Sequence, residues 1–160
     1  MKEIRTNLFI GTEADCNFSN ADIAIIHACK HPCHINAVGY KGSLPSAHPY
    51  YLIFEKQKHL FLNMVDMERE FSPIFTHPII KASLAFIEKH IYIRNVLIHC
   101  NQGLSRSPSI ALLYLARQAE IDNLNYINAV NDFRKLYPIF NPGNGIALYM
   151  SKYWNELMTF

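Results

Sequence analysis

The chain has 160 residues, of which half are hydrophobic and 18% are charged, a composition typical of one globular domain with a proper core. A formal net charge of +2 is too small to indicate nucleic acid binding. The sequence contains no apolar run long enough to predict a transmembrane segment or a signal peptide. The four cysteines are too few for a disulfide framework, so we expect a cytoplasmic protein with free thiols.

The first half of the chain predicts strands joined by loops. Apolar residues occupy 7–11 and 22–27, and the second segment suits a strand that is buried on both faces. Residues 28–49 are polar and irregular, which indicates a long loop of the kind that is often functional. Two further strands are expected at 50–54 and 59–64, joined by a short polar turn.

The second half of the chain is richer in helical patterns. Pro73 and Pro78 are expected to bracket a loop before a helix, whose apolar face carries residues spaced by three and four: Ile80, Leu84, Ile87 and Ile91. A strand is expected at 94–99.

Three more helices are predicted after this strand. Residues 110–116 are apolar almost all round, as in a central buried helix. A helix at 126–136 is followed by a break at 141–145 and by a last helix that ends near Leu157. Strands interleaved with helices predict a single α/β domain over 1–160, with a largely parallel central sheet flanked by helices.

One stretch carries the clearest chemical signal. An apolar strand ends at His99 and Cys100, and five residues that include Gly103 follow. Arg106, Ser107 and Pro108 come next, and an apolar segment with helical composition then opens. This pattern predicts a tight loop between a strand and a helix N-terminus, an arrangement that binds anions. In parallel sheets ligands bind at the carboxyl ends of strands, which is where Cys100 falls.

The residue types in this loop suit nucleophilic attack on a phosphate. A cysteine reacts as its thiolate, which backbone amides, a helix N-terminus and Arg106 all favour. The planar Arg106 side chain can also bind two phosphate oxygens. We expect Ser107 at the N-cap and Pro108 at the first helical position. The plain alternative is a buried Cys100 with Arg106 on a solvated helix start, but only this cysteine has an arginine six positions later.

These residues carry a family resemblance. The segment from His99 to Ser109 resembles the signature of the cysteine-dependent phosphatases, and it is most similar to the dual-specificity branch. Residues Leu62–Asp66 lie where that family has its general-acid loop. Residues Tyr137–Gly145 are similar to the segment that packs under the phosphate loop, and Asn7–Gly11 matches the opening strand.

The resemblance implies a set of roles. Cys100 attacks phosphorus, Arg106 stabilises the transition state, and Asp66 acts first as a general acid and then as a general base. Ser107 would bind the sulfur and His99 would hold the loop. No metal or other cofactor is expected. The residues expected to bind the phosphate are those of the loop: Asn101, Gln102, Gly103, Leu104, Ser105 and Arg106.

The identity of the general acid stays open between three carboxylates. Asp66, Glu68 and Glu70 share one loop. The strand before Asp66 would deliver this residue near the carboxyl edge of the sheet, which favours it over the two glutamates. A solvated acidic loop without a catalytic role is the plain alternative.

A second group of reactive side chains spans the end of the second strand and the start of the long loop. Two histidine–cysteine pairs and one more histidine fall there within eight positions: His27, Cys29, His31, Cys33 and His34. Their spacing matches no closed zinc site, and a second ligand pair is not evident. The simplest interpretation is therefore a strand end and loop whose polar side chains bind no metal. A third interpretation rests on a loose resemblance of this region to the tensin-type lipid phosphatases. It implies a Cys29–Cys100 disulfide under peroxide.

A phosphorylated protein or peptide is the expected substrate, through phosphotyrosine and also phosphoserine or phosphothreonine. A phosphoinositide is the second candidate, although the phosphate loop lacks the lysines that lipid-directed members usually place there. A non-catalytic phosphate-binding module and a rhodanese-type sulfurtransferase are further alternatives. No segment resembles the phosphotyrosine-recognition loop of larger tyrosine-specific enzymes, which leaves specificity open.

The redox interpretation makes a direct prediction. Peroxide should inactivate the wild-type protein reversibly, because a Cys29–Cys100 disulfide would protect the nucleophile from further oxidation. Activity after thiol treatment is the measurement, and the Cys29→Ser variant should stay inactive. Recovery of that variant to the wild-type level would rule the disulfide out.

Overall fold

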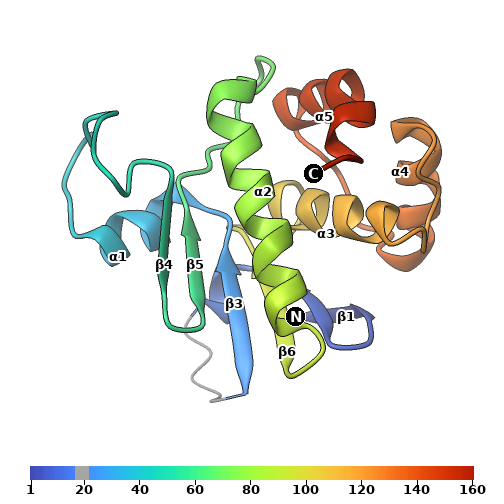
Figure 1. Ribbon diagram of the computed structural model, residues 1–160, viewed down its shortest axis with the longest axis horizontal. Helices are drawn as coiled ribbons and strands as arrows, with labels where there is room; N and C mark the ends of the chain where they lie inside the picture. The colour runs from blue at the N-terminus through green and yellow to red at the C-terminus, as the bar shows by residue number, and fades with distance from the viewer. Residues whose placement is uncertain (17–21) are drawn as a thin grey trace.

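The computed structural model describes residues 1–16 and 22–160, and these form a six-stranded mixed sheet in the order β1-β2-β6-β3-β5-β4 (Figure 1). The four central strands, β2, β6, β3 and β5, are parallel, and the two edge strands pair antiparallel with their neighbours. The expected α/β fold with a largely parallel sheet is confirmed. The strands are β1 (Lys2–Arg5), β2 (Leu8–Gly11), β3 (Ile23–His27), β4 (Ile53–Lys56), β5 (His59–Leu62) and β6 (Asn95–His99).

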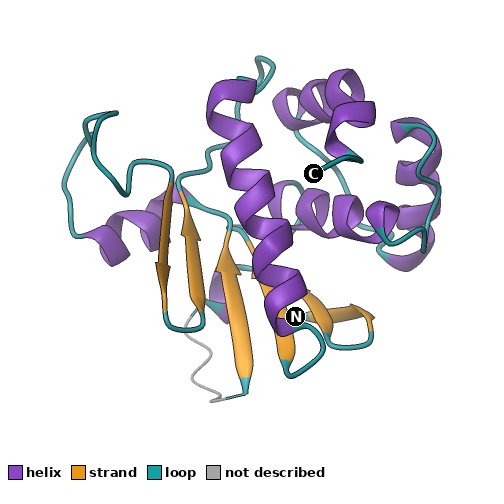
Figure 2. Ribbon diagram, viewed as in Figure 1, coloured by secondary structure: helices purple, strands orange, loops and turns teal. Residues whose placement is uncertain are grey.

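Four long helices, α2 to α5, gather on one side of the sheet (Figure 2). Two short helical turns, η1 and η2, and the one-turn helix α1 belong to the connections of the first half. The helices are η1 (Glu13–Asp15), η2 (Lys30–His34), α1 (Ile35–Val38), α2 (Pro73–His90), α3 (Arg106–Arg117), α4 (Tyr126–Leu136) and α5 (Asn144–Leu157). No helix among the described residues is long and apolar enough to cross a membrane.

The alternation of side chains along the central strands explains how the sheet is covered. In β3, Ala24 and Ile26 belong to the main core, whereas Ile23 and Ile25 form a small cluster with Leu97 of β6. Successive residues of a strand point to opposite faces, so these two sets mark the two faces of the sheet. The helices α2 to α5 contribute to the main core alone.

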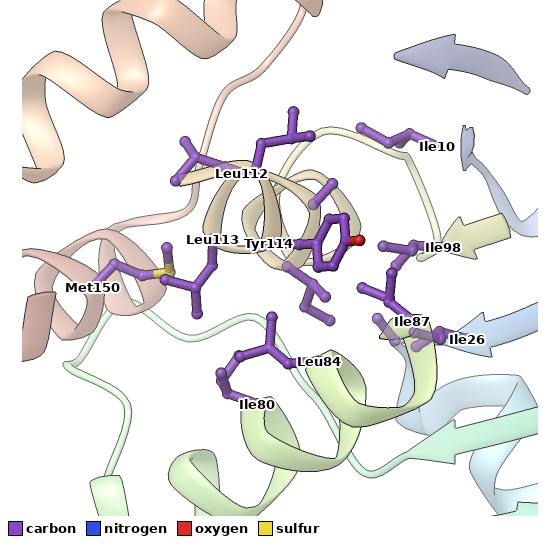
Figure 3. Close-up of a cluster of buried hydrophobic side chains, with 14 of the residues drawn as sticks. Ile10, Ile26, Ile80, Leu84, Ile87, Ile98, Leu112, Leu113, Tyr114 and Met150 are labelled. Atoms are coloured by element: carbon purple, nitrogen blue, oxygen red, sulfur yellow. The ribbon is translucent and has the colours of Figure 1, made fainter. Parts of the chain in front are cut away.

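Helix α3 lies at the centre of this core, as its apolar sequence predicts. Every residue from Arg106 to Ala116 is buried, and the helix contacts α2, α4, α5, β2 and β6. Leu112, Leu113 and Tyr114 point outward from α3 in different directions toward the neighbouring elements (Figure 3). The helix that begins at Arg106 is therefore packed against neighbouring elements on all sides.

Two expectations about local structure need correction, and one strand was not predicted. The segment between Pro73 and Pro78 is the start of α2 and not a loop, because Pro73 occupies the first helical position, where its missing N–H costs nothing. Pro78 removes one bond to the Ile74 carbonyl, and Ile74 lies on the exposed surface. Residues 28–49 are not entirely loop, since they contain η2 and α1. Strand β1 was not predicted, because its residues are mostly charged.

Candidate active site

The loop from Cys100 to Ser105 connects β6, in the middle of the sheet, to α3. The Cys100 side chain is 1% exposed, and its sulfur accepts a hydrogen bond of 3.2 Å from the Ser107 hydroxyl. The helix begins two positions earlier than expected, with Ser105 at the N-cap and Arg106 at the first helical position. Ser107 is therefore not the N-cap, and its hydroxyl is directed at the sulfur instead.

The Arg106 guanidinium lies across the carboxyl ends of the parallel strands. It is 7% exposed. Its Nη1 donates to the carbonyl oxygens of Ala28, at 3.2 Å, and Met64, at 3.1 Å, which follow β3 and β5. Its Nε donates to Asp66 Oδ2 at 2.8 Å, and its Nη2 donates to Asn101 Oδ1 at 2.8 Å. A buried charge is tolerated where such partners surround it.

The edge of Arg106 that carries Nε and Nη2 is the edge that a phosphate would use. Two parallel N–H groups on a guanidinium bind two oxygens of one phosphate or carboxylate. Here one oxygen of Asp66 and one of Asn101 satisfy these donors. Two oxygen atoms of the protein thus occupy the positions in which a bound phosphate would place its own.

The segment after α4 supports the phosphate loop from below. The Tyr137 hydroxyl donates to the Gly103 carbonyl at 3.0 Å, and the Asn141 amide donates to the Leu104 carbonyl at 2.9 Å. Burial, with a contribution from Cys100, raises the pKa of Tyr137, which keeps its donor proton in place. Gly103 has φ +71°, and a Cβ there would lie 3.0 Å from the Gly11 carbonyl oxygen, so a glycine is required.

The loop between β5 and α2, residues 63–72, carries the three candidate acids and is fastened to the start of α5. Gly145 donates its amide to the Met67 carbonyl at 2.9 Å and accepts from the Phe71 amide at 3.2 Å. Asn144 donates to the Glu68 carbonyl at 2.9 Å. These three bonds fix the path of the loop beside the phosphate loop.

Of the three carboxylates, the structure brings Asp66 to Arg106. Its Oδ1 also accepts from the Ser105 hydroxyl at 3.0 Å. Glu70 pairs with Lys152 of α5 at 3.0 Å, and Glu68 is exposed. The carboxylate that the strand direction favoured is the one beside the site.

His99 is completely buried behind the loop. Its Nδ1 lies 3.5 Å from the Cys100 carbonyl oxygen, and its Nε2 lies 2.7 Å from His27 Nδ1. The expected contact with the loop is present, and a link to β3 is added. Gln102 is exposed at the loop's outer side.

The sequence alone did not identify several contributors to the site. Tyr137 lies in the predicted supporting segment, but nothing in its pattern marks its hydroxyl as a ligand of the loop. Asn101 was expected to bind phosphate, and its bond to Arg106 depends on side-chain geometry. In the sequence Gly145 is one of two glycines near the predicted start of the last helix, which is a common place for glycine. Only the structure shows that the acid loop lies against it.

A cavity of about 500 Å³ lies next to the acid loop, between residues 43–52 and the start of α2. None of the residues around it belongs to the phosphate loop. Its wall combines aromatic side chains, Tyr51, Phe71 and Phe75, with the cations Lys30 and Arg69. Met64, whose carbonyl accepts from Arg106, also lines the cavity.

Comparisons with known proteins agree on the fold. No family model matches the chain, and no curated protein matches it. Among solved structures, a leucine rich repeat and phosphatase domain containing protein from Entamoeba histolytica superposes with a TM-score of 0.66 at 19% identity, over 98% of this chain and 92% of that chain. The human tyrosine phosphatase-like serine/threonine/tyrosine-interacting protein gives 0.66 at 21% identity, over 98% and 96%.

A third similar structure is that of PTPMT1 in complex with PI(5)P, with a TM-score of 0.61 at 13% identity, over 99% of this chain and 96% of that chain. The similarity extends over nearly the whole length of each chain. The chain therefore has the fold of the dual-specificity phosphatases, as its resemblance predicted.

The docking of the acid loop on α5 generates a stability prediction. Gly145→Ala should destabilise the protein by about 1 to 3 kcal/mol, because the new Cβ would overlap the carbonyl oxygens of Met67 and Arg69. Urea unfolding measures the change. Gly143→Ala is the matched control, since its Cβ would lie 3.4 Å from the Ser105 hydroxyl, an ordinary contact. Equal stability of the two variants would show that the loop is not docked in this way.

Proposed function

We propose that this chain, as a single catalytic domain, is a phosphomonoester hydrolase that works through a phosphocysteine intermediate. The observation that carries the proposal is the pair of N–H donors on Arg106, Nε and Nη2, which two acceptor oxygens satisfy. Arg106 directly follows the loop that begins at the nucleophile candidate Cys100. Such an arrangement binds a phosphoryl group without a metal ion. A non-catalytic module is disfavoured, because both side chains that chemistry needs are present.

In the first step the Cys100 thiolate attacks phosphorus. A sulfur–phosphorus bond forms while the bond to the leaving oxygen breaks, and Asp66 gives its proton to that oxygen. Arg106 and the amides of the loop stabilise the charge that spreads over the three other oxygens in the transition state. Ser107, which already donates to the sulfur at 3.2 Å, stays in contact with Cys100 throughout.

In the second step a water molecule attacks phosphorus. Asp66, now a carboxylate, accepts a proton from that water, and the sulfur–phosphorus bond breaks to regenerate the thiolate. The hydrogen bond from Ser107 stabilises the departing sulfur anion. The products are inorganic phosphate and an alcohol or phenol, and the enzyme returns to its starting state.

Substrate binding requires Asp66 to release Arg106. The Asp66 side chain is 43% exposed, and an ion pair with one solvated partner contributes little, so its loss costs little. The displaced Asp66 carboxylate stays near the phosphoryl group, takes up a proton from the solvent, and then serves as the acid that protonates the leaving oxygen. The ion pair thus keeps Arg106 Nε occupied and the acid in place until a phosphate enters.

We propose a phosphorylated protein or peptide as the substrate, with phosphotyrosine first and phosphoserine or phosphothreonine as further residues. The cavity beside the acid loop supports this choice, because its aromatic and cationic wall suits the side chains that flank a phosphoresidue. A reduced nucleophile suits the cytoplasm, where we expect the protein to act.

A phosphoinositide is the second candidate. PTPMT1, which shares the fold, has been solved with PI(5)P. Lys30 and Arg69 at the cavity are the cations available for further phosphates of a head group. The phosphate loop itself offers no lysine, which places the phosphoprotein candidate first.

Phosphate release tests the proposal directly. The wild-type chain is assayed on phosphotyrosine, phosphothreonine and phosphoinositide substrates, and Cys100→Ser is the control that should be inactive on all of them. Release from the first two supports a protein phosphatase, and release from the lipid alone favours the second candidate. Absence of release from every substrate would exclude the hydrolase.

The role of Asp66 has its own test. Asp66→Ala should lower turnover of alkyl phosphates by about 10²- to 10⁴-fold, the usual contribution of a general acid, and should affect aryl phosphates with good leaving groups less in the first step. Affinity for inorganic tungstate should not fall, because the substitution removes the Asp66 carboxylate from Arg106 Nε and leaves this donor for the anion. Glu70→Ala is the matched control. Unchanged turnover in Asp66→Ala would transfer the role to another group.

A further inference from the structure

Four side chains from four separate segments meet behind the phosphate loop. Cys16 follows η1, His27 ends β3, Cys33 lies in η2 and His99 ends β6. Each offers one donor atom, and these four atoms all lie within 4.8 Å of one another. The sequence showed only half of this group, because His27 and Cys33 belong to the cluster noted there, whereas Cys16 and His99 lie in distant parts of the chain.

The individual distances describe a closed ring of donors. Cys16 Sγ lies 2.9 Å from Cys33 Sγ and 3.6 Å from His27 Nδ1. His99 Nε2 lies 2.7 Å from His27 Nδ1 and 3.9 Å from Cys33 Sγ. Two sulfurs and two ring nitrogens therefore point at one common centre.

The outer nitrogen of each imidazole has a partner of its own. His27 Nε2 lies 3.0 Å from His59 Nδ1, and His99 Nδ1 lies 3.5 Å from the Cys100 carbonyl oxygen. Metal-binding histidines typically direct their second nitrogen to such an outer partner, which fixes the orientation of the ring. When His27 Nε2 and His99 Nδ1 carry the protons, His27 Nδ1 and His99 Nε2 each present a lone pair to the other at 2.7 Å. A cation between these two nitrogens would remove the repulsion between the lone pairs.

We propose that Cys16, His27, Cys33 and His99 bind a structural Zn²⁺ ion. Two thiolates and two imidazoles are a common ligand set for tetrahedral zinc. Bond lengths of about 2.3 Å to sulfur and about 2.0 to 2.1 Å to nitrogen separate tetrahedral ligands by about 3.3 to 3.8 Å. The shorter contacts need to widen by less than an ångström to accept the ion.

The surroundings identify the site as structural. His27 and Cys33 are 2% and 4% exposed and His99 is fully buried. Four protein ligands leave no open position for water or substrate, which catalytic zinc requires. The ion would tie the ends of β3 and β6 to η2 and to the segment after η1. Since His99 directly precedes the proposed nucleophile, the site would also hold the start of the phosphate loop.

Metal content tests the proposal. The full chain, expressed with zinc in the medium and purified with a phosphine reductant, should contain one Zn²⁺ per chain by elemental mass spectrometry. Cys16→Ser and Cys33→Ser should lose it. Cys29→Ser and Cys100→Ser should keep it, because these thiols lie outside the four ligands. Cys16→His should retain the ion, since it keeps a donor at the half-buried position.

A second measurement is independent of how the variants fold. Removal of zinc from the wild-type chain with a chelator should lower its melting temperature, and added Zn²⁺ should restore it. Titration with Co²⁺ should give the visible absorption of a tetrahedral ion together with a thiolate charge-transfer band, at one equivalent. A reduced wild-type chain that holds no zinc and binds no Co²⁺ would overturn the proposal. Zinc that is lost only in Cys100→Ser, or a Cys16–Cys33 disulfide in protein isolated without the reductant, would overturn it as well.

Discussion

The buried guanidinium of Arg106 is the constraint around which this fold is arranged. A permanent charge withdrawn from water must find acceptors, and Arg106 finds them in the carbonyls of Ala28 and Met64 and in the side chains of Asn101 and Asp66. These partners lie beyond the carboxyl ends of β3, β5 and β6, which are neighbours in the sheet. The parallel arrangement of these three strands is what allows one side chain to reach all of them.

The hydrogen bonds of Arg106 also connect the fold with the proposed reaction. Two of the four acceptors are backbone carbonyls that stay in place, and the other two are side chains that a phosphate can replace. The backbone carbonyls therefore anchor Nη1 of Arg106, and the partners of Nε and Nη2 are the ones that the proposed phosphate would replace. Tyr137 forms a hydrogen bond to the loop after Cys100, and Gly145 forms hydrogen bonds to the acid loop, so both loops are held in place around Arg106. The proposed zinc ion would extend the same support to His99.

Local patterns predicted most of the fold, because strand and helix signals are properties of neighbouring residues. The burial of β3 on both faces and the all-round apolar α3 followed from the sequence, as did the loop between Cys100 and Arg106. The start of α2 was missed because Pro78 is tolerated at an exposed turn. The ring formed by Cys16 and its three partners was missed for a different reason. Its members come from four segments, and only tertiary folding brings them together.

The central claim is that a phosphoryl group replaces the oxygens of Asp66 and Asn101 on Arg106 and is transferred to Cys100. Acid quenching of the Asp66→Asn variant during turnover of p-nitrophenyl phosphate tests it most directly, because this variant should form the intermediate faster than it hydrolyses it. Mass spectrometry should find one phosphoryl group on the peptide that carries Cys100, bound to that residue. Turnover without a phosphorylated Cys100, or a phosphoryl group on His99 instead, would contradict the account.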